Sequence, residues 1–253
     1  MILEQFDPNK SAIINPWDII EKIDGFPEIV VSCFARETFQ RMINKYGAKK
    51  IAETGMANMS IPIYEAEYKG RKIGFMNSYV GAPGCIGMLD DLLAMGMKKL
   101  IIFGTCGVLD HKIDDISIII PNIAVRDEGT SYHYQPASDE IEVNEHTIED
   151  FERYLVEKKL SHTKGKVWTT DAMYRETIDK MKKRKEDGCI VVDMECSAVA
   201  AWAKLREVKV LHFFYAADSL SEEGWDERSL SNHSAVDEKD LVAEVAVGFS
   251  EWI

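Results

Sequence analysis

Two carboxylates follow apolar runs in this sequence, at positions where side chains of α/β proteins reach a cleft. Asp218 follows the almost wholly apolar residues 208–217, and Glu195 follows the apolar segment that ends in VVDM. Partial burial raises the pKa of a carboxyl, so Asp218 could hold a proton near neutrality and act as a general acid. Glu195, in the first turn of a helix, could accept hydrogen bonds from sugar hydroxyls. Helix capping is the alternative role for each residue.

A glycine-containing turn follows another buried run. Residues 104–107 read Gly-Thr-Cys-Gly directly after the apolar LIIF. Glycines at the carboxyl end of a strand let the backbone approach a ligand, and free N–H groups beside the Thr105 hydroxyl suit an anion. A tight packing turn is the alternative. The sequence has no GxGxxG and no GxxxxGK[ST] motif, so dinucleotide and P-loop phosphate sites lack support.

The elements that must position these residues alternate along the chain. Apolar runs predict strands at residues 28–32, 72–78, 99–104, 116–124, 166–170, 190–194 and 208–217. Amphipathic patterns predict helices at residues 35–45, 83–95, 146–159, 174–185, 195–205 and 237–252. This order favours a largely parallel sheet that is covered on both faces. Because no linker or repeat interrupts it, we expect residues 1–253 to form a single domain.

Composition excludes several classes of partner. A net charge of -13 and a pI near 5.0 disfavour a nucleic-acid polymer, which requires a basic face. The five cysteines never form a CxxC pair, and the six histidines are scattered, so we expect reduced thiols and no metal site. No signal peptide is evident and no apolar run reaches the ~18 residues that span a bilayer. The sequence therefore predicts a cytoplasmic protein without membrane contact.

Six segments in collinear order carry a resemblance to a known family. They run from about Ile29 to Asp218 and read SYVGAPGCIGMLDDL, FGTCG, RDEGTSYHY, TTDAMYRET, DMECSA and AADSL. Together they resemble the nucleoside phosphorylases, which include uridine phosphorylases and hexameric purine nucleoside phosphorylases and are related to methylthioadenosine nucleosidases. The resemblance implies a three-layer α/β domain whose mixed, partly barrel-like central sheet is flanked by helices. It also implies a homo-oligomer, either a dimer or a hexamer built of dimers.

The same resemblance implies the reaction and the residues of the sugar and base sites. The enzyme would cleave the N-glycosidic bond with inorganic phosphate as co-substrate and no cofactor. Glu195 would hold the ribose 2′ and 3′ hydroxyls while Met194 packs against the sugar. Asp218 matches the acid that protonates a purine at N7. Met173 and Tyr174 match an aromatic pair that lines the base and sugar pockets.

A further set of residues is implied for the base, the phosphate and the loop around them. Arg175 lies where uridine phosphorylases bind the base, although the glutamine that accompanies that arginine is missing. The residues implied for phosphate are Arg36, Gly104, Thr105 and Arg126. Arg228 would tune Asp218 or close over the base, and an exposed surface arginine is the alternative.

Two departures from the family pattern leave alternatives open. Ile102 stands where phosphorylases carry a second phosphate arginine, and no arginine lies near Met59, where a third is expected. Since arginine contacts dominate phosphate recognition, a nucleosidase that uses water is the nearest alternative. A non-catalytic nucleoside-binding module is the third. Asp218 favours purines, whereas RDEGTSYHY and Arg175 are closer to uridine phosphorylases.

Overall fold

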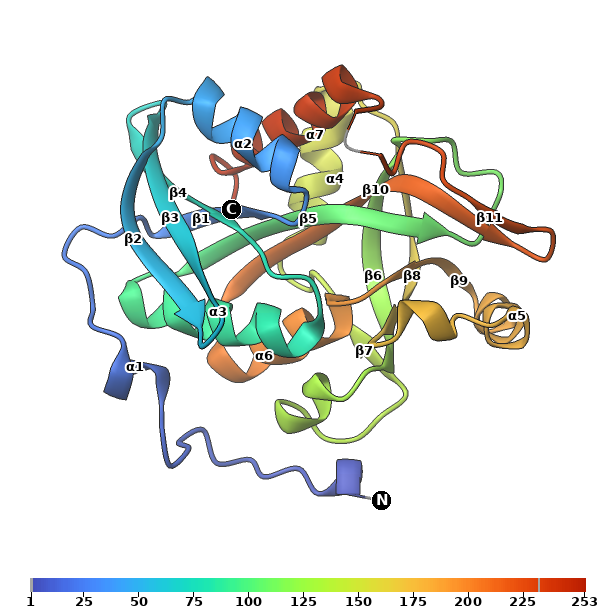
Figure 1. Cartoon of the computed structure of the whole chain (residues 1–253), viewed down its shortest axis with the longest axis horizontal. Helices are drawn as coiled ribbons and strands as arrows, with labels where there is room; N and C mark the ends of the chain where they lie inside the picture. The colour runs from blue at the N-terminus through green and yellow to red at the C-terminus, as the bar shows by residue number, and fades with distance from the viewer. Residues whose placement is uncertain (1, 232) are drawn as a thin grey trace.

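One mixed sheet forms the frame of the molecule (Figure 1). The computed structural model describes residues 2–231 and 233–253, and within them the sheet has 11 strands in the order β11-β10-β6-β8-β9-β5-β1-β4-β3-β2, with β7 beside β6. The strands are β1 Ile29–Cys33, β2 Lys49–Met56, β3 Met59–Tyr68, β4 Arg71–Asn77, β5 Lys99–Val108, β6 Ile118–Asp127, β7 Glu140–Glu142, β8 His162–Thr170, β9 Cys189–Asp193, β10 Lys209–Ser221 and β11 Gly224–Asp226.

Half of this sheet closes into a barrel. β5 pairs with β9 at one edge and with β10 at the other, while β6 and β8 complete the circuit between them. The β5–β10 and β8–β9 pairs are parallel, whereas β5–β9 and β10–β6 are antiparallel. The predicted mixed, partly barrel-like sheet is therefore confirmed.

Helices cover the sheet on both faces, which confirms the three-layer arrangement. α2 (Arg36–Lys45), α4 (Ile148–Glu157) and α7 (Val236–Phe249) lie on one face, and α3 (Ala82–Met95) and α6 (Cys196–Arg206) lie on the other (Figure 1). α5 (Ile178–Glu186) packs beside β9. The remaining short helices are η1 (Ile2–Glu4), α1 (Pro16–Ile19), η2 (Thr130–His133) and η3 (Met173–Arg175).

The apolar runs of the sequence form the core. The four residues Leu100–Phe103 of β5 are fully buried, as expected for a strand covered on both faces. Beneath α4 and α7, Phe151 packs on Phe213 and Phe249 with ring centroids 4.9 and 5.0 Å apart. Such aromatic pairs add packing energy beyond the area that they bury. The core therefore fixes β5 and β10, the two strands that lead to the predicted site.

The structure corrects the sequence prediction at one missing hairpin and at two element boundaries. The antiparallel hairpin of β2 and β3 was not predicted, because its half-exposed strands carry charged residues between the apolar ones. The predicted helix 174–185 is divided into η3 and α5, with Thr177 as the N-cap of α5. The strand predicted to end at Ala217 continues to Ser221 and turns back as β11, so Asp218 lies within a strand and not in a loop or at an N-cap.

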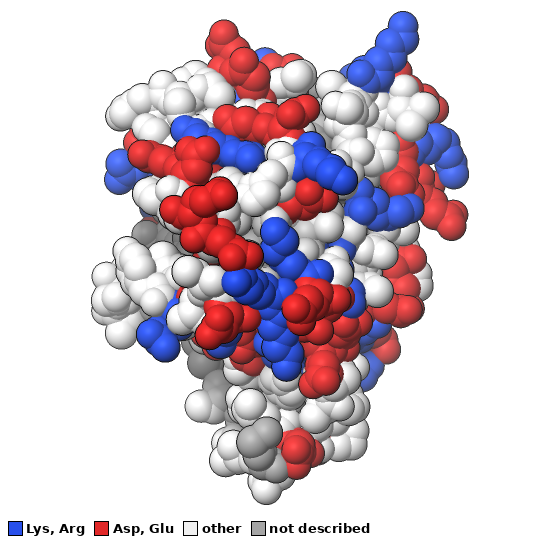
Figure 2. Space-filling model, turned by 90° about the vertical axis from the view of Figure 1, so that its right-hand side faces the viewer, with Lys and Arg blue, Asp and Glu red and all other residues white. Residues whose placement is uncertain are grey.

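On the face shown in Figure 2, acidic and basic side chains are interspersed, without a continuous basic area. All five cysteines are free and buried, as predicted. Among the described residues, no helix is both long enough and apolar enough to cross a membrane.

Candidate active site

A cavity of about 760 Å³ lies where the ends of β5, β9 and β10 meet. It is large enough for a ligand of nucleoside size. Its lining combines apolar walls with four acidic side chains, those of Glu176, Asp193, Glu195 and Asp218. The lining residues are Phe34, Val80, Thr105, Cys106, Gly107, Met173, Tyr174, Glu176, Val192, Asp193, Met194, Glu195, Phe214, Asp218, Leu220, Trp225 and Leu230. The two acids singled out in the sequence, Glu195 and Asp218, therefore share one cavity.

Glu195 is almost sealed from solvent. Its side chain is at the start of α6, only 6% of the residue is exposed, and Oε1 accepts a hydrogen bond from Gly81 N–H at 2.5 Å. Burial raises the pKa of Glu195, and the neighbouring Asp193 raises it further. A hydrogen-bond donor from a ligand, such as a sugar hydroxyl, would stabilise the charged form of this carboxyl.

Asp193, and not Glu195, caps α6. Its Oδ2 accepts the backbone N–H groups of Glu195 at 2.9 Å and Cys196 at 2.7 Å, while its Oδ1 accepts the Thr169 hydroxyl at 2.7 Å. Because Asp193 accepts the first N–H group of α6, the Glu195 carboxylate does not act as the cap and is available to a ligand. Asp193 was missed in the sequence, where it stands two residues before Glu195 in the same segment.

Asp218 occupies an irregular position in β10. The pairing with β5 shifts by one residue between Ala216 and Asp218, which is a bulge of the kind that redirects side chains at active sites. Asp218 Oδ2 accepts a hydrogen bond from Trp225 Nε1–H at 2.8 Å. Burial raises the pKa of Asp218, while the Trp225 hydrogen bond and the charge of Arg228 lower it. The raised pKa favours the protonated form that a general acid requires.

The glycine-containing turn lies inside β5 and not after it. Thr105 and Gly107 line the cavity, and a Cβ on Gly107 would lie 2.6 Å from Leu220 Cδ1. A Cβ on Gly104 would lie 2.7 Å from Phe34 Cδ2, so Gly104 permits Phe34 to pack closely. The packing alternative therefore explains Gly104, whereas Thr105 stands in the cavity.

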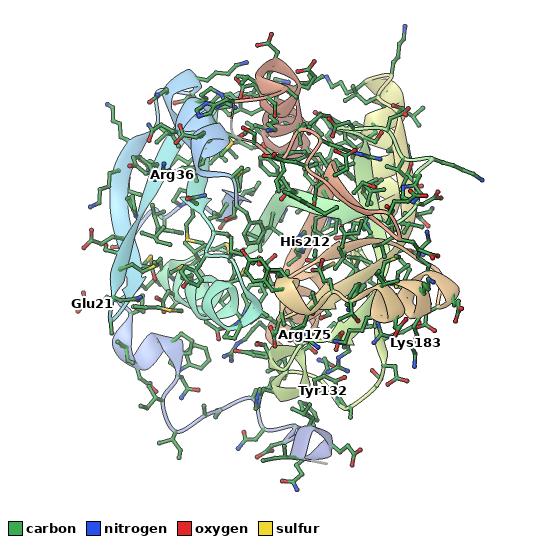
Figure 3. All side chains as sticks on the ribbon, turned by 45° about the vertical axis from the view of Figure 1, so that its right-hand side comes forward. Glu21, Arg36, Tyr132, Arg175, Lys183 and His212 are labelled. Carbon is green, nitrogen blue, oxygen red and sulfur yellow. The ribbon has the colours of Figure 1, made fainter. Side chains whose placement is uncertain are left out.

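None of the four arginines implied for the site lines the cavity. The Arg36 side chain is 82% exposed and pairs with Glu37 at 3.1 Å. Arg126 is 4% exposed and is engaged within residues 131–138, where it binds Ser131 Oγ at 2.8 Å and Pro136 O at 2.7 Å. Arg228 donates to Ile113 O at 3.1 Å. Arg36 and Arg175 are well separated in Figure 3, and Arg175 is exposed.

The two residues predicted to line the base pocket are present at the rim. Met173 is 47% exposed and Tyr174 is 94% exposed, and both belong to η3. Met194 precedes Glu195 and also lines the cavity. Glu176 and Trp225 were missed, because each follows a polar or irregular segment whose pairing cannot be read from local periodicity.

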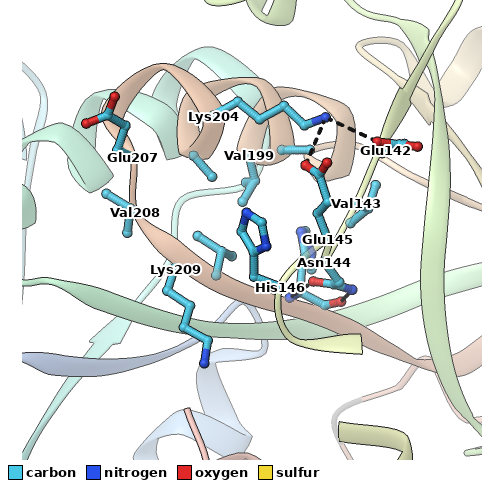
Figure 4. A pocket seen from close by; sticks show the side chains of 14 residues that line it. Glu142, Val143, Asn144, Glu145, His146, Val199, Lys204, Glu207, Val208 and Lys209 are labelled. Atoms are coloured by element: carbon cyan, nitrogen blue, oxygen red, sulfur yellow. Dashed lines mark hydrogen bonds and ion pairs between the residues drawn. The ribbon is translucent and has the colours of Figure 1, made fainter. Parts of the chain in front are cut away.

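A second cavity, of about 470 Å³, lies between α6, β10 and the residues after β7 (Figure 4). Lys204 at its rim pairs with Glu145 at 3.2 Å and with Glu142 at 3.7 Å. None of the predicted site residues lines this cavity. The chemistry predicted from the sequence therefore belongs to the larger cavity.

Comparison with known proteins agrees with this fold. Residues 28–247 match the phosphorylase superfamily. The chain is 28% identical over 197 residues to a DeoD-type purine nucleoside phosphorylase of Bacillus cereus, an alignment covering 70% of this chain and 82% of that protein.

Two solved structures extend the likeness. A uridine phosphorylase from Vibrio fischeri ES114 has a TM-score of 0.75 and 20% identity, with 90% of this chain and 93% of that chain covered. A mutant futalosine hydrolase from Helicobacter pylori strain 26695 has a TM-score of 0.70 and 13% identity, with 90% of this chain and 100% of that chain covered. At these identities the two structures show a shared fold.

Proposed function

Because the chain belongs to the phosphorylase superfamily, we propose that it cleaves the N-glycosidic bond of a purine nucleoside with phosphate, giving the free base and ribose 1-phosphate. The observation that carries this proposal is the cavity shared by Glu195 and Asp218. The first carboxyl is sealed and the second is half-buried beside an indole N–H. Two acids in such different environments are suited to different tasks.

The reaction requires the two acids at opposite ends of the substrate. Cleavage passes through an oxocarbenium-like sugar and a departing base, so an enzyme must hold the sugar and neutralise the base. Glu195 accepts hydrogen bonds from the ribose hydroxyls, and Met194 packs against the ring. Asp218 donates a proton to the leaving purine at N7. Met173 and Tyr174 cover the base from the rim.

Phosphate is the co-substrate, and the chemistry needs no other cofactor. Thr105 supplies a hydroxyl on the cavity wall. Arg36 begins α2, two residues after the cavity residue Phe34, and its exposed side chain is the proposed phosphate ligand from this subunit. Any further phosphate arginine would come from a neighbouring subunit of a homo-oligomer.

Purine nucleosides are the proposed substrate class. Asp218 is suited to protonate N7, an atom that pyrimidines lack. The Bacillus cereus relative is named a purine nucleoside phosphorylase, which supports the same preference. Uridine is the alternative, favoured by the likeness to the Vibrio fischeri uridine phosphorylase fold.

Hydrolysis is the second candidate function, and one observation favours it. No lysine or arginine lines the cavity among the residues that the structure describes. Phosphate recognition usually depends on charge-assisted arginine contacts, whereas water needs none. The Helicobacter pylori neighbour is named a hydrolase, so this fold also carries that chemistry.

One experiment separates the two reactions. Purified protein is incubated with inosine, adenosine or uridine, with and without phosphate, and the base and sugar products are quantified. We expect base release only with phosphate, together with ribose 1-phosphate. Release of base and free ribose without phosphate would establish hydrolysis, and binding without turnover would indicate a non-catalytic module.

A further inference from the structure

Glu176 is a cavity carboxyl to which the proposed reaction gives no role. It lies in the short break between η3 and α5, where its backbone N–H donates to Met173 O at 3.3 Å. Its side chain is partly buried against the cavity that also holds Glu195 and Asp218. Among the described residues, no hydrogen bond is made to its carboxylate. A cavity carboxyl without a protein partner is available to a ligand.

The charges that act on Glu176 include that of Asp218 but not that of Glu195. The groups that act on it are Asp218 of β10 and Lys180 of α5. Lys180 is itself paired with Asp127 at 3.1 Å, so its charge is shared. The charges that act on Glu195, in contrast, are those of Asp193 and Asp171. Of the two acids of the proposed reaction, Asp218 is therefore the one whose charge acts on Glu176, and both residues line the same cavity.

Two acids that line one cavity and interact through their charges limit what the ligand can be at that position. A phosphate would be repelled by both carboxylates, and a hydrocarbon would leave the Glu176 carboxylate without a hydrogen bond. A purine offers two adjacent polar positions on one edge, namely the acceptor N7 and the substituent at position 6. If Asp218 protonates N7, as the proposed function requires, the neighbouring carboxyl meets position 6.

We propose that Glu176 determines which substituent the enzyme accepts at position 6 of the purine. As a carboxylate, Glu176 accepts a hydrogen bond from a 6-amino group, as in adenine. As a neutral acid, it donates a hydrogen bond to a 6-oxo group, as in hypoxanthine. The inference rests on the proposed function for the orientation of the base.

The protonation of Glu176 makes this selection dependent on pH. Burial raises the pKa of Glu176 to about 7, the charge of Asp218 acts in the same direction, and Lys180 opposes it. Below this pKa the neutral acid predominates and favours the 6-oxo base. Above it the carboxylate predominates and favours the 6-amino base. The preference for adenine over hypoxanthine should therefore increase as the pH rises.

Binding of the free bases tests the inference without catalysis. The dissociation constants of adenine and hypoxanthine are measured by calorimetry on the full chain at about pH 6 and about pH 8, on either side of the pKa. Because Asp218 faces N7 of both bases, its titration largely cancels in the ratio of the two constants. We expect the preference for adenine to rise about tenfold between these pH values, as for a hydrogen bond to a charged group.

Two variants complete the test. Glu176→Gln carries an amide, which does not titrate in this pH range. The ratio of the dissociation constants of adenine and hypoxanthine should therefore be the same at both pH values in this variant. Glu186→Gln removes an exposed glutamate at the end of α5 and should reproduce the wild-type increase. A wild-type ratio that does not change with pH, or an unchanged increase in Glu176→Gln, would overturn the inference.

The outcome is separable from that of the proposed function. A pH-dependent ratio in a protein that turns over no nucleoside would support the role of Glu176 and contradict catalysis. Phosphate-dependent turnover together with a ratio of dissociation constants that does not change with pH would support the proposed phosphorolysis and contradict the role of Glu176. The wild-type ratio needs no variant, so it remains decisive if Glu176→Gln does not fold.

Discussion

At the scale of single residues, the environments of the two main carboxyls differ in solvent access and partner. Glu195 is buried, and its carboxylate accepts a hydrogen bond from the Gly81 N–H, which holds the side chain in place. Asp218 is more accessible, and the indole N–H of Trp225 orients it. A fixed acceptor suits sugar binding, whereas an oriented acid with a raised pKa suits proton transfer.

The first prediction concerns proton transfer. Replacing Asp218 by Asn removes the ionisable proton and keeps the size of the side chain. We expect kcat for a purine nucleoside to fall by about 10²–10⁴-fold, which is the usual contribution of a positioned general acid. Asp179→Asn, an exposed change on α5, is the control and should retain wild-type turnover. A kcat of Asp218→Asn within threefold of the wild-type value, which corresponds to about 0.6 kcal/mol in the activation barrier, would contradict the role of Asp218.

The second prediction concerns the sugar. Steady-state kcat/KM is compared for inosine and 2′-deoxyinosine in the wild type and in Glu195→Gln. Because Glu195 binds the ribose hydroxyls, the wild type should prefer the ribonucleoside, and the variant should lose about tenfold or more of that preference, as expected for a hydrogen bond to a charged group. An equal preference for inosine over 2′-deoxyinosine in both enzymes would mean that Glu195 has a structural role alone.

At the scale of secondary-structure elements, the β10–β11 hairpin places Trp225 against Asp218. The hairpin pairs Ser219 with Asp226 and Leu220 with Trp225, so the indole returns towards the bulge. Its hydrogen bond lowers the pKa of Asp218, while burial raises it. The hairpin thus moves the pKa of Asp218 downwards, against the larger effect of burial.

This gives a prediction for the pH profile. Trp225→Phe removes the indole N–H and raises the pKa of Asp218, because the hydrogen bond to its charged form is lost. A general acid acts while protonated, so activity falls as the pH rises through its pKa. The alkaline limb of kcat should therefore move to higher pH in Trp225→Phe, and it should not move in Trp17→Phe, which alters an exposed tryptophan on α1. A shift to lower pH would contradict the hydrogen-bond argument.

The cap of α6 gives a prediction for stability. Asp193 binds the N–H groups of Glu195 and of Cys196, the first residue of α6, and the Thr169 hydroxyl, so Asp193→Ala leaves these donors without a partner. We expect the free energy of unfolding to fall by about 1–2 kcal/mol or more. Urea denaturation measures this change, with Asp24→Ala in an exposed loop as the control. Unchanged stability would mean that water replaces the carboxylate at no cost.

Local sequence patterns predicted some of these elements and missed others. The continuous apolar runs of β5 and β10 and the amphipathic helices were predictable, because burial on one face or on both leaves a periodic signal. The break at Glu176 was not, since residues 174–185 retain helical periodicity across it. The exchange of capping roles between Asp193 and Glu195 was equally hidden, because both acids stand at the same helix end and only coordinates decide which one turns inward.

At the scale of the whole molecule, closure of the barrel brings the site together. β9 and β10 both pair with β5, so that Glu195, two residues after β9, and Asp218, within β10, line one cavity. The resemblance predicted that the two acids act on one ligand, and both line the same cavity, while their roles stay a prediction. The roles of the arginines could not be predicted in the same way, because the partners that engage Arg126 lie within residues 131–138, a segment without regular periodicity.

The rim of the cavity gives a prediction for the assembly. Tyr174, Trp225 and Val80 line the cavity and are 94%, 60% and 51% exposed. Apolar side chains gathered at one rim are typical of an interaction surface. We expect light scattering after size-exclusion chromatography to show a dimer or a hexamer at micromolar concentration. A monomer over that range would contradict the homo-oligomer and the supply of an arginine by a neighbour.

The central claim is that Glu195 and Asp218 hold opposite ends of one nucleoside. A crystal structure with a purine C-nucleoside, whose base and sugar cannot be separated, measures this directly. We predict ribose hydroxyls within about 3 Å of the Glu195 carboxylate and the ring atom at the N7 position within about 3 Å of the Asp218 carboxyl. A nucleoside bound in the cavity in the reverse orientation, or bound outside it, would contradict the account.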